Sequence, residues 1–398
     1  MKIRVGVFFG GKSVEHEVSV ISALQACRSL NKEKYDIIPV YITKNTEFYI
    51  GEKIGSIEAY HNIPALLRES TRVLPVGNNG TVELLRYPMK KFGDNIAAVI
   101  DVALPIVHGT NVEDGALQGY LQTLGVPYAG CDVLSSALGM DKYAMKCVFA
   151  DNGIPVLPAT VVNVKQFTRE HDAVIELIES RTQYPVIVKP VNLGSSVGIR
   201  KAKGRAELED ALDYAFTFAI KVLVENAVTE LKEINCSVLG DYEDAEASEC
   251  EEPIANDEIL SYQDKYVGGT KSSGGKSGMA SLKRKIPADI TPEQREEVRT
   301  LAVKAFRSLG CAGVARIDFM LDKATGKIYL NEINTIPGSL SFYLWEPVGV
   351  KYTAMLDKLI ELALKRSREN KSITFSFDSN ILENASFGGS KGSKGAKC

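Results

Sequence analysis

The feature that most constrains this chain is a regular alternation of short apolar strands with helices near its start. Residues 3–9 (IRVGVFF) are apolar, β-branched and aromatic, and two glycines end the run. A helix is expected over 14–29, and a second strand over 36–43. Alternating strands and helices favour a parallel sheet whose loops face one crevice. The sequence therefore predicts an N-terminal open parallel α/β sheet.

This sheet is expected to continue after a less regular stretch. Residues 44–95 are predicted to be irregular, apart from a hairpin signal at 78–80. A further buried strand is predicted over 96–107, and a helix from about 113 to 124.

The length of the chain sets the number of domains. A chain of 398 residues exceeds the roughly 250–300 residues at which single cores stop growing. We predict an N-terminal α/β domain at 1–130, and two α+β domains at 131–228 and 229–368. The Gly-, Ser- and Lys-rich loop 261–281 is expected to be a lid, and 369–398 a flexible tail. The predicted helices of the second and third domains are 133–152, 166–180, 205–219, 291–309 and 352–368, and the predicted strands are 159–162, 185–189, 199–202, 221–225, 313–321 and 327–333.

Composition argues against several classes of function. The net charge is −3, so no basic field exists to hold nucleic acid or an anionic membrane. The longest apolar stretch, 96–107, is shorter than the ~18 residues of a spanning helix. The apolar run at the N-terminus is too short for a signal peptide. Seven cysteines without a CxxC pair indicate a reducing compartment, and we expect a cytoplasmic protein.

Residues 6–13 match the pattern G-x-x-x-x-G-K-[ST], which would make the protein a P-loop NTPase. A P-loop wraps phosphate with backbone N–H groups after its strand has ended. Here the first positions of the pattern belong to the predicted strand, and only Gly10 and Gly11 can form the turn. The P-loop is therefore the less favoured alternative.

Polar residues follow two N-terminal strands at the edge where a ligand would bind. Glu15 and Glu17 stand in the first turn of the first helix, with Ser13 as its expected N-cap. These carboxylates complement the helix dipole, or else bind a ligand ammonium. His108 follows strand 96–107, where it either forms a turn or faces the ligand.

Lys189 ends an apolar strand, where a lysine is costly to bury unless it meets an anion. The next segment, 192–198 (NLGSSVG), has small residues that let backbone N–H groups approach a phosphate. A hairpin turn is the alternative. The lysine and the small residues together favour phosphate binding.

Two strands near the C-terminus carry polar residues that alternate with apolar ones. Arg316 and Asp318 share one face of the first strand, and Glu332 and Asn334 share one face of the second. If the strands pair, Asp318, Glu332 and Asn334 form an oxygen cluster. Such a cluster suits Mg²⁺, which takes its remaining ligands from phosphates and water. A solvated polar face is the alternative.

Four other residues give weaker signals. Glu225 ends a strand and Glu233 follows it, and such carboxylates can accept from adenine or ribose, although isolated ones are usually solvated. Lys265 and Tyr266 lie in the long loop, where they reach over a site or pack.

In their order, these segments resemble the ATP-grasp ligases, and closely the D-alanine–D-alanine ligase family, from residue 3 to about 365. The matching pieces are GGKSVEHEVS (10–19), HGTNVEDGALQGYLQTLGVPYAG (108–130), MDKYAMK (140–146), YPVIVKPVNLGSSVG (184–198), the pair 265–266, GVARIDFML (313–321) and NEINTIPG (331–338). The resemblance implies an ATP-grasp fold of three domains, in which the two α+β domains sandwich ATP.

The resemblance also implies a reaction. ATP would convert one D-alanine to an acyl phosphate, and a second D-alanine would attack it to give D-alanyl-D-alanine for peptidoglycan. The implied cofactors are ATP and two Mg²⁺ or Mn²⁺ ions. The partners would be small D-amino acids rather than nucleic acid or membrane, and the assembly a homodimer.

Matching residues receive roles from the same resemblance. Glu15 would bind the first ammonium, and His108 would orient that amino acid. Arg316 and the N–H of Gly338 would stabilise the oxyanion. Asp318, Glu332 and Asn334 would bind the metal ions, and Tyr266 of the lid would form a hydrogen bond toward Ser195 and Glu15. The residues implied for ATP are Lys142, Lys189, Gly194, Ser195, Ser196, Glu225, Glu233 and Lys265.

One segment departs from the family pattern. Many members have a Ser that contacts the carboxylate of the second amino acid, and this chain has Tyr343 there, followed by Leu344. Ser339 or Ser341 is a candidate to replace that Ser. The acceptor therefore stays open, and ligation of D-Ala to D-Ser or of another amino acid pair is the alternative.

Overall fold

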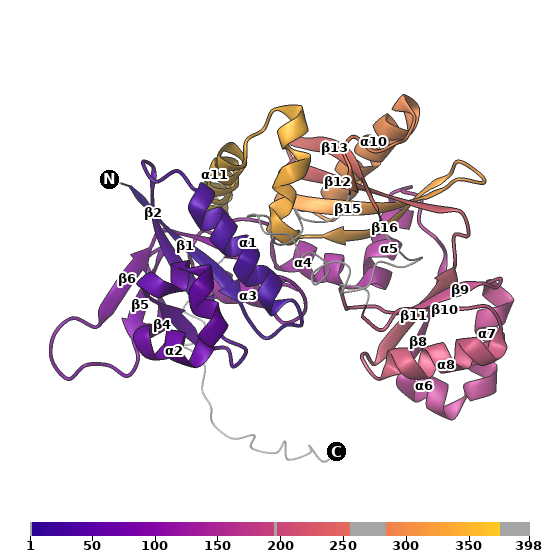
Figure 1. Cartoon of the computed structure of the whole chain (residues 1–398), viewed down its shortest axis with the longest axis horizontal. Helices are drawn as coiled ribbons and strands as arrows, with labels where there is room; N and C mark the ends of the chain where they lie inside the picture. Colours follow the sequence, from indigo (N-terminus) through magenta and orange to yellow (C-terminus); the bar gives the residue numbers. More distant parts are fainter. Residues whose placement is uncertain (1, 195–196, 255–283, 375–398) are drawn as a thin grey trace, which may run out of the picture.

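The computed structural model describes residues 2–194, 197–254 and 284–374, which form three β-sheets with flanking helices. Figure 1 shows the N-terminal and central sheets at opposite ends of the molecule, with the C-terminal sheet between them. The N-terminal sheet has the order β6-β5-β4-β3-β2-β1-β7. Its strands are β1 (Ile3–Gly10), β2 (Tyr35–Ile42), β3 (Phe48–Ile50), β4 (Thr71–Asn78), β5 (Thr81–Arg86), β6 (Ile96–Ile100) and β7 (Val102–Ile106).

The predicted parallel arrangement is confirmed for β2, β1 and β7, whereas the other neighbouring strands pair antiparallel. Residues 44–95 are more regular than predicted, because they include three strands, the short helices η1 (Glu52–Gly55) and η2 (Ile57–Asn62), and α2 (Ile63–Glu69). The hairpin at 78–80 is confirmed, with Asn78 opposite Thr81.

The single strand predicted over 96–107 is wrong. Asp101 divides it into β6 and β7, since its carboxylate accepts from the backbone N–H of Arg4 at 2.8 Å and from the Arg4 guanidinium. Gly10 ends β1 with a φ of 93°, and a Cβ there would lie 2.3 Å from the Ile42 carbonyl oxygen. A residue with a side chain would therefore be strained at this turn.

Helix α1 (His16–Ser29) covers the N-terminal sheet, together with α3 (Ala116–Thr123). The predicted N-cap, Ser13, is wrong. The helix begins later, with Glu15 in the cap position, and the Ser13 hydroxyl accepts from the Glu15 N–H at 3.1 Å. The hydroxyl therefore shapes the turn that precedes the helix.

The central sheet has the order β10-β9-β11-β8. Its strands are β8 (Ala159–Asn163), β9 (Val186–Pro190), β10 (Arg200–Ala202) and β11 (Lys221–Asn226), and its helices are α6 (Val164–Arg169), α7 (His171–Arg181) and α8 (Arg205–Phe216). The helices contribute apolar side chains to one core with β9 and β11. The helix predicted over 133–152 is two helices, α4 (Val133–Met140) and α5 (Lys142–Asp151), because the Asp141 side chain caps α5.

The C-terminal sheet has the order β14-β13-β12-β15-β16. Its strands are β12 (Leu231–Gly240), β13 (Ala245–Pro253), β14 (Arg284–Lys285), β15 (Gly313–Asp322) and β16 (Ile328–Asn334), followed by η4 (Gly338–Leu344) and η5 (Glu346–Val348). Helix α10 (Pro292–Ser308) packs on one face. Side chains alternate along a strand, so the polar residues of β12 and β15 lie on the other face.

The hydrophobic cores do not follow the predicted domain boundaries one by one. Met145 and Phe149 of α5 belong to the core of the C-terminal sheet. The last helix, α11 (Tyr352–Lys371), packs with the N-terminal sheet through Met355 and Leu359. The helix runs three residues past its predicted end, and residues 375–398 of the predicted tail lie outside the described part.

Within the described residues, no helix combines the length and the apolar character that crossing a membrane requires.

Candidate active site

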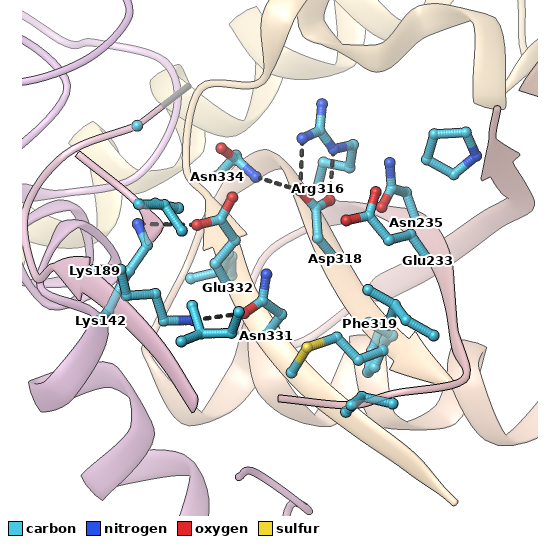
Figure 2. Close-up of a pocket in the computed structure, with 18 of the residues that line it drawn as sticks. Lys142, Lys189, Glu233, Asn235, Arg316, Asp318, Phe319, Asn331, Glu332 and Asn334 are labelled. Carbon is cyan, nitrogen blue, oxygen red and sulfur yellow. Dashed lines mark hydrogen bonds and ion pairs between the residues drawn. The ribbon is translucent and has the colours of Figure 1, made fainter. Parts of the chain in front are cut away.

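A cavity of about 620 Å³ lies where the three sheets meet. Its walls include Glu15 and His108, which follow β1 and β7 of the N-terminal sheet, Lys189 of the central sheet, and Arg316 and Glu332 of the C-terminal sheet. Figure 2 shows the polar side chains of the C-terminal sheet directed into this cavity. Residues far apart in the sequence thus share one site.

A row of polar side chains crosses the C-terminal sheet on its cavity face. Glu251 of β13 stands opposite Asn235 of β12, which stands opposite Asp318 of β15, which stands opposite Glu332 of β16. The predicted pairing of the last two strands is therefore confirmed. We call these four residues the polar row.

Arg316 lies beside the middle of the polar row, two residues before Asp318 on β15. Its Nε and Nη2 each donate to a carboxylate oxygen of Asp318 at 2.6 Å, and Asn334 Nδ2 donates to Asp318 Oδ2 at 3.1 Å. Burial lowers the pKa of Arg316, but the adjacent Asp318 outweighs it and holds the pKa well above its usual range. Arg316 is thus a fixed cation on the cavity wall.

Lysines gather at the β16 end of the row. Lys142 Nζ contacts Glu332 Oε2 at 2.9 Å and donates to the Leu193 carbonyl at 2.9 Å. Lys189 forms an ion pair with Glu225 and donates to Asn331 Oδ1 at 3.1 Å. A β-bulge after Asp318 leaves Asn331 without a strand partner, so Asn331 and its neighbour Glu332 both reach the lysines.

Lys146 is a buried residue of this cluster that sequence reasoning missed. Its Nζ lies 2.9 Å from Glu225 Oε2. Burial lowers its pKa, and Lys189 and Lys142 nearby lower it further, against the opposing effect of Glu225. The available signal was its spacing of four residues from Lys142 on one helix, which puts both on one face.

Glu225 lines the cavity, and its carboxylate is held between Lys146 and Lys189. Burial raises its pKa, but Lys189 and Lys146 lower it below its usual range, so the carboxylate is ionised. Three buried lysines and two carboxylates, Glu225 and Glu332, leave one positive charge at this end. Such a cluster favours an anion.

The N-terminal wall contains two buried groups that join the sheets. His108 Nδ1 donates to the Ile336 carbonyl at 2.8 Å, and its Nε2 lies 3.0 Å from the Ser22 hydroxyl. Burial lowers the pKa of His108, so the ring is neutral. Glu113 accepts from the backbone N–H groups of Gly109 and Ile336 at 2.9 Å.

Glu15 is buried at the N-terminus of α1, beside two glycines. A Cβ on Gly109 would lie 2.8 Å from Glu15 Oε2, and a Cβ on Gly194 would lie 3.0 Å from the same atom. Gly194, in the predicted phosphate loop, therefore lies directly beside Glu15. Glu17, in contrast, is exposed and pairs with Lys44 at 2.6 Å.

Glu113→Gln is expected to flatten the dependence of stability on pH. Burial raises the pKa of Glu113 to about 8, with a further rise from Glu15, against an ordinary 4.5. The folded protein keeps a proton that the unfolded chain loses, so this group makes the free energy of unfolding fall between about pH 5 and 8. The slope is at most about 1.4 kcal/mol per pH unit.

Urea unfolding at several pH values measures this effect. The control is Glu17→Gln, whose carboxylate is exposed and has a pKa below its usual range, partly because of Lys44. Between about pH 5 and 8 that variant should keep the pH dependence of the unmodified protein, because Glu17 is ionised in the folded and the unfolded chain there. The same slope in Glu113→Gln as in the unmodified protein would contradict the raised pKa.

The other predicted residues fall into three groups. Glu233, Gly194 and Gly338 line the cavity. Ser195, Ser196, Lys265 and Tyr266, with the lid 261–281, lie outside the described residues. Ser339, Tyr343 and Leu344 are not part of the described cavity wall.

These last three residues are held by other contacts. Ser339 Oγ donates to Gln25 Oε1 at 2.7 Å, and Leu344 has no exposed surface. Tyr343 lies beneath Arg284, whose Cζ is 3.9 Å from the centre of the ring. The structure therefore places Arg284 on the wall in front of Tyr343.

The P-loop interpretation of residues 6–13 is wrong. β1 includes Gly6 and runs to Gly10, and it pairs with β2 along this length, so its backbone groups belong to the sheet. Lys12 is exposed and is not among the residues that line the cavity.

The cluster predicted for Mg²⁺ offers oxygen atoms from Asp318, Glu332 and Asn334. Among the described residues, no group of three or more His, Cys, Asp or Glu forms a metal site. The two carboxylates and one amide fit a hard ion that takes its remaining ligands from phosphate. In this structure Arg316 pairs with Asp318 and Lys142 pairs with Glu332. A bound metal ion would displace these cations or share the carboxylates with them.

Comparison with known proteins agrees with this geometry. The family described as D-ala D-ala ligase N-terminus matches residues 4–131, and D-ala D-ala ligase C-terminus matches 148–361. A D-alanine–D-alanine ligase of Acetivibrio thermocellus is 40% identical over 386 residues, which cover 93% of this chain and 98% of the relative.

Two solved structures share the fold. The D-alanine-D-alanine ligase from Coxiella burnetii has a TM-score of 0.76 and 28% identity, covering 93% of this chain and 96% of its own. The VanG D-Ala:D-Ser ligase from Enterococcus faecalis has a TM-score of 0.74 and 32% identity, covering 91% and 100%. The predicted fold and family are therefore confirmed. The chain belongs to the D-alanine–D-alanine ligase family, whose members are ATP-dependent enzymes.

Proposed function

We propose that this enzyme joins two D-alanines to D-alanyl-D-alanine, with ATP as the activating substrate and peptidoglycan precursor as the use of the product. One observation carries the proposal: a single cavity has a lysine cluster at one end of the polar row and the fixed cation Arg316 beside its middle. An acyl-phosphate reaction needs anion binding at a phosphate and at a developing oxyanion.

The lysine cluster would bind the phosphates of ATP. Lys142 and Lys189 reach the cavity, and Lys146 supports Lys189 through Glu225, which contacts both lysines. Both Glu225 oxygens contact lysine, so we assign Glu225 a positioning role in place of the predicted contact with adenine. Glu233, on the cavity wall, is proposed to face the ribose.

Two Mg²⁺ ions, or Mn²⁺, would be held by Asp318, Glu332 and Asn334, and when bound they would offset charge on the phosphates. Around them, Lys142 remains within reach of Glu332, and Asn331 keeps Lys189 directed along the wall. These residues fix the position of the phosphate chain before the reaction.

The donor amino acid would lie at the N-terminal wall. Glu15 is proposed to bind its ammonium, while the neutral His108, fixed between Ser22 and Ile336, orients it. Attack by the second amine turns the acyl carbonyl into a tetrahedral oxyanion. Arg316 and the N–H of Gly338, both on the cavity wall, are proposed to stabilise it.

Phosphate release and product analysis test the proposal. The protein with ATP and Mg²⁺ should release phosphate with D-alanine and form D-alanyl-D-alanine, and adding D-serine should leave the homodipeptide as the main product. No phosphate above background with D-alanine would overturn it. D-Ala-D-Ser as the main product would instead favour the alternative that the VanG likeness represents. A cytoplasmic homodimer stays a prediction.

A further inference from the structure

A cation that has no role in the proposed reaction so far lies beside Glu251, at the end of the polar row away from the lysines. Arg284 of β14 lines the cavity and stands opposite Pro253, two residues beyond Glu251 on β13. Its Nη1 donates to Glu251 Oε2 at 2.8 Å. Glu251 is almost fully buried, so this guanidinium has a fixed position on the wall.

The other contacts of Glu251 hold the arginine in place. Its Oε1 accepts from Asn235 Nδ2 at 3.0 Å and from the Tyr343 hydroxyl at 3.3 Å. Burial raises the pKa of Tyr343 to about 12, so the phenol keeps its proton and donates it. The Arg284 guanidinium also stacks on the Tyr343 ring, with Cζ 3.9 Å from its centre. A planar guanidinium held in this way suits bidentate binding of a carboxylate.

Arg284 lies too far from the lysines to share their phosphate. Adjacent strands are about 4.8 Å apart, so Glu251 and Glu332, three strand spacings apart in the polar row, are separated by about 14 Å. Arg316 lies between these two ends, and the nearby Tyr343 and Glu251 both raise its pKa. The cavity wall thus has a cation on either side of Arg316, with the lysines at one end and Arg284 at the other.

We propose that Arg284 binds the α-carboxylate of the acceptor amino acid, with Tyr343 and Glu251 as positioning residues. The proposal rests on the proposed ligase function and deepens it. A carboxylate at Arg284 leaves the acceptor's amine directed toward Arg316, where the acyl group would be attacked. The acceptor class is therefore an amino acid with a free carboxylate, and amides or esters are poor acceptors.

Arg284→Met tests this assignment through two separate Michaelis constants. Loss of a charge-assisted hydrogen bond should raise the KM of the acceptor D-alanine by about 10- to 100-fold. The KM values of the donor D-alanine and of ATP should change less than about threefold. The unmodified enzyme should prefer D-alanine over D-alaninamide as acceptor, and the variant should lose that preference.

The matched control is Arg72→Met in the N-terminal sheet. Arg72 also stacks on a tyrosine, with Cζ 4.7 Å from the centre of the Tyr87 ring, and pairs with Glu47 at 3.1 Å, but it is not part of the described cavity wall. It should keep both constants. Arg284→Lys retains the positive charge and should give an acceptor KM between those of the unmodified enzyme and Arg284→Met. If Arg284→Met does not fold, the lysine variant still tests the assignment.

Three results would overturn the assignment: a rise in donor KM alone, an unchanged acceptor KM in both variants, or an unchanged preference over D-alaninamide. Failure of the proposed function itself looks different. In that case the unmodified enzyme forms no dipeptide from D-alanine at any concentration.

Discussion

Replacing Arg316 with methionine is expected to lower kcat by about 100- to 1000-fold, the usual cost of removing one oxyanion donor. The guanidinium is buried and held by both oxygens of Asp318, so it is in place before the oxyanion forms. The KM of ATP should change little, because the lysine cluster lies at the β16 end of the row. Steady-state kinetics of dipeptide formation measures both constants.

Arg295→Met is the matched control for this variant. Arg295 binds both oxygens of Glu249 at 2.6 and 2.8 Å in the same domain, but it is not among the described residues that line the cavity. It should keep kcat, although it loses a similar ion pair. A kcat of Arg316→Met within about threefold of the unmodified enzyme, in a folded protein, would contradict the oxyanion role.

Lys189→Ala is expected to weaken nucleotide binding by about 10- to 100-fold, since a charge-assisted contact to phosphate is lost. The lysine is nearly buried between Glu225 and Asn331, and Lys146 remains to balance Glu225 after the substitution. Titration calorimetry with ADP and Mg²⁺ gives the dissociation constant. Urea unfolding of the same samples shows whether the fold is kept.

Lys12→Ala separates this site from the P-loop pattern. The side chain is exposed, beyond the end of β1, so the dissociation constant should match that of the unmodified protein. Loss of binding in Lys12→Ala with normal binding in Lys189→Ala would reverse the assignment of the nucleotide site.

The local alternation of side chains made part of the site predictable. A strand has a period of two, so Arg316 and Asp318 had to share a face, and so did Glu332 and Asn334. The apolar run and the two glycines after it located β1 in the same way. Helix starts were less predictable, because Ser13 bonds within the turn before α1 rather than capping it.

Contacts across long sequence separations were not predictable from these patterns. Asp101 divides one apolar run into two strands because Arg4, 97 residues away, binds it. Glu113 binds the Ile336 N–H across 223 residues, although an acidic residue before a helix has an ordinary local explanation. No local period contains information about such partners.

The sequence by itself determined the family, the two strands that carry Arg316, Asp318, Glu332 and Asn334, and the faces that these residues share, because these depend on residue order and on the geometry of single strands. Only the tertiary structure decided which charges meet. It brought Lys146 into contact with Glu225, and a β-bulge placed both Asn331 and Glu332 at the lysines. It also stacked Arg284 on the ring of Tyr343, where the sequence showed only an unusual tyrosine. The physical reason is that these contacts arise where separate sheets and strands pack together, and burial then requires each charge to find a partner there.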